Sequence, residues 1–142
     1  MTTDATNFEL DPRLAADTLP LARLALCDLR LMNDQRYPWL VLVPRRPGAV
    51  EWIDLAEADQ QTLWAEVRQA AVALRTMTKP DKLNVAALGN QVRQLHVHLI
   101  ARSQDDDAWP DPVWGRYPAL PYNAGGDAFR EELLALMPEP GR

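Results

Sequence analysis

Residues 89–102 read GNQVRQLHVHLIAR, and they contain both histidines of the 142-residue chain. Apolar and polar residues alternate through this stretch, which is the pattern of a β-strand with two different faces. We expect a turn at Gly89-Asn90 and a strand over residues 95–101, with the apolar face in the core. The positions on the polar face are Gln94, His96 and His98. A period of two places the two imidazoles about 6–7 Å apart along the strand.

The segments before this strand predict further strands and a long helix. Apolar runs predict strands at residues 24–31, 39–43 and 82–88. Apolar residues spaced three and four apart predict a helix over residues 54–77, which Lys79-Pro80 ends.

The two ends of the chain carry weaker signals. A short helical turn is expected from Pro12 to Ala16, followed by a turn at Asp17-Thr18. Residues 103–125 are rich in proline and predict an irregular segment, and residues 127–137 predict a last helix. The order of elements is an α+β plan, in which an antiparallel sheet carries helices on one face. The length fits a single domain over residues 1–142.

Composition and charge narrow the class of protein. The net charge is −5, which argues against a nucleic acid polymer as partner, because such binders usually carry a clustered basic face. A nucleotide ligand stays compatible, since a pocket can be locally positive. Cys27 is the only cysteine, so no intramolecular disulfide can form, which fits a reducing compartment. No signal peptide and no apolar stretch of about 18 residues is present, so we expect a cytoplasmic protein away from the membrane.

The pair His96 and His98 has three readings. Two such histidines are often surface residues or hydrogen-bonded residues of a half-exposed strand. Neutral imidazoles also bind zinc, but a further ligand is needed and none is obvious, since Asp105–Asp107 is typical of a solvated loop. The third reading is nucleophilic catalysis, in which a neutral imidazole attacks phosphorus and divides one displacement into two easier ones.

Context favours the third reading, because residues 89–102 resemble the active-site segment of the histidine triad (HIT) family. The pattern there is His-φ-His-φ-His-φ-φ, with φ apolar, after a Gly-Gln-Ser-Val-like turn. His96 and His98 match the second and third histidines. Residues Gly89 to Val92 correspond to the Gly-Gln-Ser-Val-like turn of the family, and Arg102 matches the basic residue that follows the pattern.

The resemblance extends over roughly residues 24–102. Leu31–Asp34 matches the strand end that meets the nucleoside in the family, and Leu40–Pro44 matches its Leu-Val-x-Pro strand. It implies a HIT-like antiparallel sheet of about five strands with one long helix. Residues 103–142 would add an irregular segment and a C-terminal helix to this single domain.

Two positions depart from the family pattern. Gln94 stands where the first histidine of the triad is expected, and Trp39 stands where a further upstream histidine usually occurs. A glutamine can hydrogen-bond a phosphate but cannot carry a proton charge. The variant therefore keeps the nucleophile and leaves the acid–base partnership and the substrate open.

The resemblance implies a mechanism and a set of site residues. His96 would attack the α-phosphorus of a nucleotide and form a nucleotidyl-histidine, which water or another acceptor resolves. His96 must be neutral to attack, with its proton on the far ring nitrogen and held by a carbonyl group. His98 would contact the phosphate and help to protonate the leaving group, and Gln94 would bind a phosphate oxygen. The expected substrate-binding residues are Asn33, Gly89, Asn90 and Gln91.

Some alternatives stay open at this stage. Asn33 either contacts the ribose of the ligand or is an ordinary turn residue, and the two interpretations have equal weight. Four aromatic residues either cover the core or a subunit contact, or they line the pocket: Trp109, Trp114, Tyr117 and Tyr122. The function is either a nucleotide hydrolase or nucleotidyl transferase, or a nucleotide-binding module with little turnover because Gln94 replaced a histidine. Candidate substrates are dinucleoside polyphosphates, nucleoside phosphoramidates and adenylylated small molecules. No cofactor or metal is expected, and the resemblance implies a homodimer.

Overall fold

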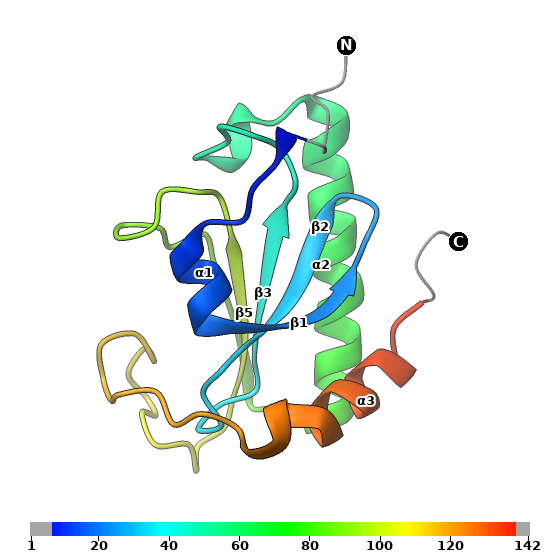
Figure 1. The fold of residues 1–142 in the computed structure, drawn as a ribbon. Helices are drawn as coiled ribbons and strands as arrows, with labels where there is room; N and C mark the ends of the chain where they lie inside the picture. The colour runs from blue at the N-terminus through cyan, green and yellow to red at the C-terminus, as the bar shows by residue number, and fades with distance from the viewer. Residues whose placement is uncertain (1–6, 139–142) are drawn as a thin grey trace.

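A five-stranded antiparallel sheet forms the centre of the protein (Figure 1). The computed structural model describes residues 7–138. The strand order across the sheet is β1-β2-β3-β5-β4, and every neighbouring pair is antiparallel. The elements are α1 (Pro12–Asp17), β1 (Thr18–Arg23), β2 (Cys27–Met32), β3 (Trp39–Pro44), a 3₁₀ turn (Trp52–Asp54), α2 (Glu57–Thr78), β4 (Lys82–Ala86), β5 (Val97–Arg102), a 3₁₀ turn (Asn123–Gly126) and α3 (Asp127–Ala135). This is the α+β fold with a long helix and a C-terminal helix that the sequence predicts.

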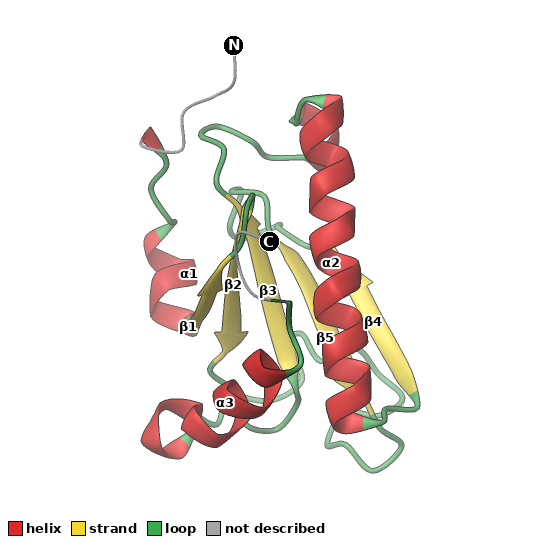
Figure 2. Ribbon diagram, turned by 90° about the vertical axis from the view of Figure 1, so that its right-hand side faces the viewer, coloured by secondary structure: helices red, strands yellow, loops and turns green. Residues whose placement is uncertain are grey.

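Both faces of the sheet are covered, by different parts of the chain. Figure 2 shows α2 along one face and α1 on the opposite side of the sheet. Leu40 and Leu42 of β3 belong to the core cluster that includes the buried residues of α2 and α3. Val41 and Val43 belong to a second cluster, with Leu14 of α1 and with Ala108 and Val113 of the C-terminal segment. All residues of β3 and β5 are therefore buried, which explains the continuous apolar run at residues 39–43.

The first strand is a correction to the sequence prediction. A turn was expected at Asp17-Thr18, but Thr18 begins β1, which pairs with β2 at the edge of the sheet. Pro20 lies inside this strand, at the point where the register shifts. Proline has no N–H to donate and is confined to edge strands or bulges. A proline inside a sequence segment therefore argues against a strand there, and this edge strand was not predicted.

The histidine strand begins later than expected. β5 starts at Val97, so His96 and Gln94 lie in the segment that leads into it. The predicted apolar face is confirmed, because Leu95, Val97 and Leu99 are all in the core cluster under α2. His98 lies on the opposite face, toward α1. In residues 7–138 no helix has the length and apolarity that crossing a membrane would require.

Candidate active site

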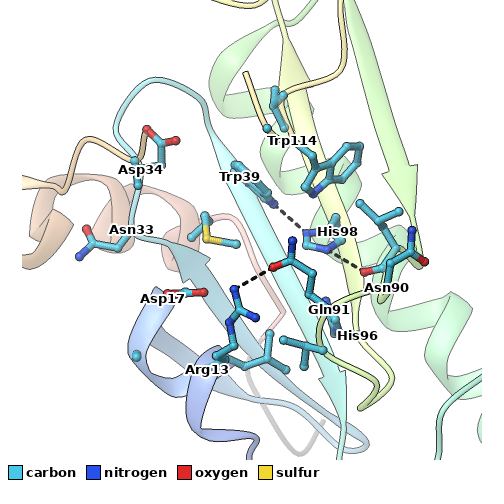
Figure 3. A pocket seen from close by; sticks show the side chains of 18 of the residues that line it. Arg13, Asp17, Asn33, Asp34, Trp39, Asn90, Gln91, His96, His98 and Trp114 are labelled. Carbon is cyan, nitrogen blue, oxygen red and sulfur yellow. Dashed lines mark hydrogen bonds between the residues drawn. The ribbon is translucent and has the colours of Figure 1, made fainter. Parts of the chain in front are cut away.

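A cavity of about 600 Å³ opens on the face of the sheet opposite α2. Its walls come from α1, the end of β2, the loop over residues 88–92, β5 and residues 113–121 (Figure 3). The polar residues that line it are Arg13, Asp17, Asn33, Asp34, Asn90, Gln91, His96 and His98. The structure thus brings both histidines together with three of the four substrate-binding residues predicted from the sequence. The rings of His96 and His98 lie closer than the strand spacing predicts, with centroids 4.8 Å apart.

The His96 ring is held by one main-chain hydrogen bond. Its Nδ1 lies 2.7 Å from the carbonyl oxygen of Gln94. A carbonyl oxygen can only accept, so the proton of the neutral ring lies on Nδ1 and the lone pair lies on Nε2. The side chain is 5% exposed and lines the cavity. This is the carbonyl acceptor that the nucleophilic reading of His96 requires.

The His98 ring is fixed in the opposite tautomer. The indole Nε1 of Trp39 donates to His98 Nδ1 at 3.0 Å, so the lone pair lies on Nδ1. The proton then lies on Nε2, which is 3.3 Å from the carbonyl oxygen of Leu88. Sheet register explains the first contact: Val41 pairs with His98 across the ladder, and Trp39 lies two residues from Val41 on the same face. The tryptophan at the family's upstream histidine position therefore orients His98.

Burial and a neighbouring ring keep His98 uncharged. Desolvation, and then the charge of a protonated His96, lower the pKa of His98 to about 4, against a smaller opposing effect of the hydrogen bond to the Leu88 carbonyl. Trp39 acts in the same direction as burial, because its hydrogen bond exists only while Nδ1 is unprotonated. Near neutral pH, His98 offers a neutral N–H and no acidic proton, which removes the expected help from His98 in protonating a leaving group.

The loop over residues 88–92 forms the wall next to the histidines. Asn90 and Gln91 line the cavity, and Gln91 Oε1 accepts a hydrogen bond from Arg13 Nη2 at 2.8 Å. Gly89 was expected to bind substrate, but it is not among the lining residues. A Cβ at Gly89 would meet the carbonyl oxygen of Val92 at 2.7 Å, so the glycine allows the loop to fold tightly on itself.

Gln94 is, with Gly89, a predicted site residue that the structure does not bring into the cavity. Its side chain turns to the N-terminal segment, where Nε2 donates to the Glu9 carbonyl and Oε1 accepts from the Asp11 amide, each at 2.8 Å. The expected contact between Gln94 and a phosphate has no support in this arrangement. The physical reason is the pair of hydrogen bonds to the N-terminal segment, which no local pattern around Gln94 reveals.

The far end of the cavity is built by polar residues that hold the C-terminal segment. Asn33 Oδ1 accepts from the amide of Tyr122 at 2.9 Å. Asp34 Oδ1 accepts from the amides of Arg36 and Leu120. Both side chains line the cavity, so Asn33 is at once a structural residue and available to a ligand.

The four aromatic residues of the C-terminal segment divide between the two readings. Trp114 and Tyr117 line the cavity, and the Trp114 ring packs at 5.1 Å from the His98 ring. Tyr122 packs against the main core, and Trp109 lies over the Arg102 guanidinium. The indole N–H of Trp114 is buried and has no hydrogen-bond partner within residues 7–138.

The structure also bears on two other hypotheses from the sequence, a phosphate contact by Arg102 and a metal site. Arg102 is 2% exposed and forms a buried ion pair with Asp106, with an N–O distance of 2.7 Å, so it is structural. Within the described part of the chain, no group of three or more histidine, cysteine or acidic residues is placed to hold a metal ion. Sequence reasoning missed Arg13 and the bond from Trp39 to His98, because nothing in a local pattern links such distant residues.

Comparison with known proteins adds a family and several solved structures. The HIT domain model matches residues 16–105. A histidine triad (HIT) protein from Sinorhizobium meliloti 1021 is 44% identical, with a TM-score of 0.92, over 94% of this chain and 100% of that chain. Histidine triad proteins from Bradyrhizobium japonicum and Marinobacter aquaeolei VT8 are 47% and 45% identical, each with a TM-score of 0.89 over 92% of this chain and 98% and 96% of theirs. Among curated proteins no significant match is found.

The lowered pKa of His98 predicts a stability that depends on pH. The ordinary pKa of about 6.5 applies to the unfolded chain, and the pKa is about 4 in the fold. Between these values the unfolded chain binds the extra proton, so the free energy of unfolding falls as the pH is lowered from 6.5 to 4, by about 3 kcal/mol from this residue. Chemical denaturation at several pH values measures this. The non-titrating variant His98→Gln should lose that part of the pH dependence; an unchanged profile would contradict the assignment.

Replacing Trp39 should release the His98 ring. In Trp39→Phe the indole donor is gone, so the pKa of His98 should rise from about 4 toward 6.5, as followed by NMR titration of the ring. Trp114→Phe is the matched control, because Trp114 packs on the same ring without bonding to it. If both variants shift the pKa of His98 equally, packing rather than the hydrogen bond determines the charge state.

Proposed function

This chain belongs to the HIT domain family, and we propose that it is a nucleotide hydrolase or nucleotidyl transferase whose nucleophile is His96. The observation that carries the proposal is the hydrogen bond from His96 Nδ1 to the Gln94 carbonyl. It leaves the Nε2 lone pair on a ring that lines an open cavity, and such a lone pair is what attack on phosphorus requires.

In the first step His96 Nε2 attacks the α-phosphorus of the nucleotide. A P–N bond forms while the P–O or P–N bond to the leaving group breaks, and the electron pair departs with the leaving group. The imidazole ring becomes positively charged, so its Nδ1–H bond to the Gln94 carbonyl becomes a charge-assisted hydrogen bond and strengthens as the intermediate forms. Because the acceptor is main chain, the loss of a histidine side chain at position 94 leaves this support intact.

In the second step water or another acceptor attacks the same phosphorus. The P–N bond breaks, its electron pair returns to Nε2, and the proton of the attacking hydroxyl passes to solvent. The side-chain amides of Asn90 and Gln91 lie on the walls from which hydrogen bonds can stabilise the charge on the phosphoryl oxygens.

The charge states of the site bear on the choice of substrate. His98 is uncharged, and the Gln94 side chain lies outside the cavity, so neither supplies an acidic proton to a leaving group. Substrates whose leaving group departs as a stable anion suit such a site. We therefore favour phosphoanhydrides, such as dinucleoside polyphosphates, and adenylylated carboxylates over nucleoside phosphoramidates, whose amine needs a proton to leave.

Removal of the nucleophile is the primary test. His96→Ala should lower the turnover of a panel of dinucleoside polyphosphates by at least about 10³-fold, because the covalent route is lost. Mass spectrometry of quenched wild-type reactions should detect a nucleotide attached to His96. Binding of AMP by the variant is the control for an intact pocket. Equal turnover in wild type and variant would remove His96 from the chemistry.

The leaving-group preference has its own test. For substrates with the same nucleoside, kcat/KM for the phosphoanhydride should exceed that for the phosphoramidate by about 10² or more, the size of a missing general-acid contribution. Steady-state kinetics at pH 7 measure the ratio. Equal values would mean that a group in the site does protonate the amine.

A nucleotide-binding module with little turnover is the second candidate. The observation that favours it is the same absence of an acidic proton on His98. It predicts that AMP binds while no product forms and no nucleotide becomes attached to His96. Detection of the covalent adduct decides between the two functions.

A homodimer is also part of the proposal, on the resemblance to the family. β4 is an edge strand of the sheet, and Val85 on it is 47% exposed. Trp64 and Val72 of α2 are exposed as well. These are the long helix and the strand edge through which family members commonly meet.

A further inference from the structure

Arg13 brings a positive charge to the cavity. Among residues 7–138 it is the only lysine or arginine on the cavity walls. It lies on α1, and its Nη2 points to Gln91 on the opposite wall, next to His96 (Figure 3). The partner is a neutral amide oxygen, so the contact orients the guanidinium without neutralising it.

The charge of Arg13 has no carboxylate partner within the described residues. Six other arginines form ion pairs, Arg36, Arg45, Arg46, Arg102, Arg116 and Arg130. Arg23, Arg30, Arg68, Arg75 and Arg93 form none within residues 7–138, but Arg13 alone of this unpaired group lines the cavity. A guanidinium that has no carboxylate partner among the described residues, and only Nη2 hydrogen-bonded there, matches an oxyanion ligand in charge and in geometry.

Gln94 holds the segment that carries Arg13. Its amide group makes two hydrogen bonds to main-chain groups, accepting from the Asp11 amide and donating to the Glu9 carbonyl. Asp11 is the N-cap of α1, and its side chain accepts from the amide of Arg13 at 2.8 Å. The connection therefore runs from Gln94 through the N-cap to Arg13.

The type of side chain at position 94 fits this role. A glutamine amide presents one acceptor and one donor side by side, as a peptide group does, and can pair with the donor and acceptor of a neighbouring main chain. An imidazole has one donor and one acceptor on nitrogens that point apart. The residue that departs from the histidine pattern is thus the one whose chemistry suits a bridge to residues 9–11.

We propose that Arg13 binds a phosphate oxyanion of the nucleotide and that Gln94 is the positioning residue that keeps Arg13 at the cavity. The inference rests on the proposed function and deepens it, since it adds a cationic contact from the N-terminal segment to the phosphate chain. That contact also stabilises the anion that departs from a phosphoanhydride.

Calorimetric titration with AMP and with adenosine tests the role of Arg13. Arg13→Gln should weaken AMP binding by about tenfold or more, the size of a lost charge-assisted hydrogen bond, and leave adenosine binding unchanged. Arg23→Gln on β1 is the matched control, because Arg23 is exposed and does not line the cavity. It removes the same charge and should leave both affinities unchanged.

A double-mutant cycle tests the role of Gln94. Gln94→Ala should weaken AMP binding in the wild-type background and have no further effect in Arg13→Gln, since both changes remove one contact. Hydrogen exchange should also show faster exchange of the α1 amides in Gln94→Ala. Gln94→Glu is a second variant, which keeps the shape but places an oxygen against the Glu9 carbonyl, and it should behave in the same way.

The possible failures are distinguishable. If wild type binds AMP and Arg13→Gln binds it equally well, the assignment of Arg13 is wrong while the proposed function stands. If the effects of Gln94→Ala and Arg13→Gln are additive, Gln94 does not act through Arg13. A wild-type protein that binds neither AMP nor adenosine would overturn the proposed function and the role of Arg13 together.

Discussion

The hydrogen bond from His96 Nδ1 to the main-chain carbonyl of Gln94 is the contact on which the account of this protein depends. It determines which nitrogen carries the proton and therefore which nitrogen can attack. Because the acceptor belongs to the backbone, it is present whatever side chain occupies position 94. That independence explains how the chain can carry a glutamine at this position and still present a nucleophile.

The two histidines have different environments, although they are two residues apart. His96 is hydrogen-bonded to the Gln94 carbonyl, two residues before it, whereas His98 lies between the Trp39 indole and the Leu88 carbonyl. Their neutral rings therefore carry protons on different nitrogens, and burial lowers the pKa of His98 to about 4. In the proposed function His96 is the nucleophile and Arg13 is the basic side chain, and this division of roles underlies the proposed preference for anionic leaving groups.

Local sequence patterns could predict four of the five strands and the long helix, and the resemblance to the HIT family placed Asn90 and Gln91 with the histidines. The apolar face of Leu95, Val97 and Leu99 was readable because these three side chains pack in the core under α2. The contacts that join distant segments were not readable: Arg13 meets Gln91 across 78 residues, and Trp39 meets His98 across 59. No periodicity relates residues so far apart, because only the pairing of β3 with β5 and the docking of α1 bring them together. Gln94 was misplaced for the same reason, since its amide pairs with Glu9 and Asp11 of the N-terminal segment, more than 80 residues away along the chain.

Nitrogen-detected NMR of the histidine rings tests the central claim most directly, and the chain contains only two histidines. At pH 8 the tautomer of each ring can be assigned from long-range proton–nitrogen couplings. The account predicts a proton on Nδ1 and a bare Nε2 for His96, with the reverse for His98. A proton on Nε2 of His96 would contradict it, because the nitrogen that faces the phosphate could then no longer attack.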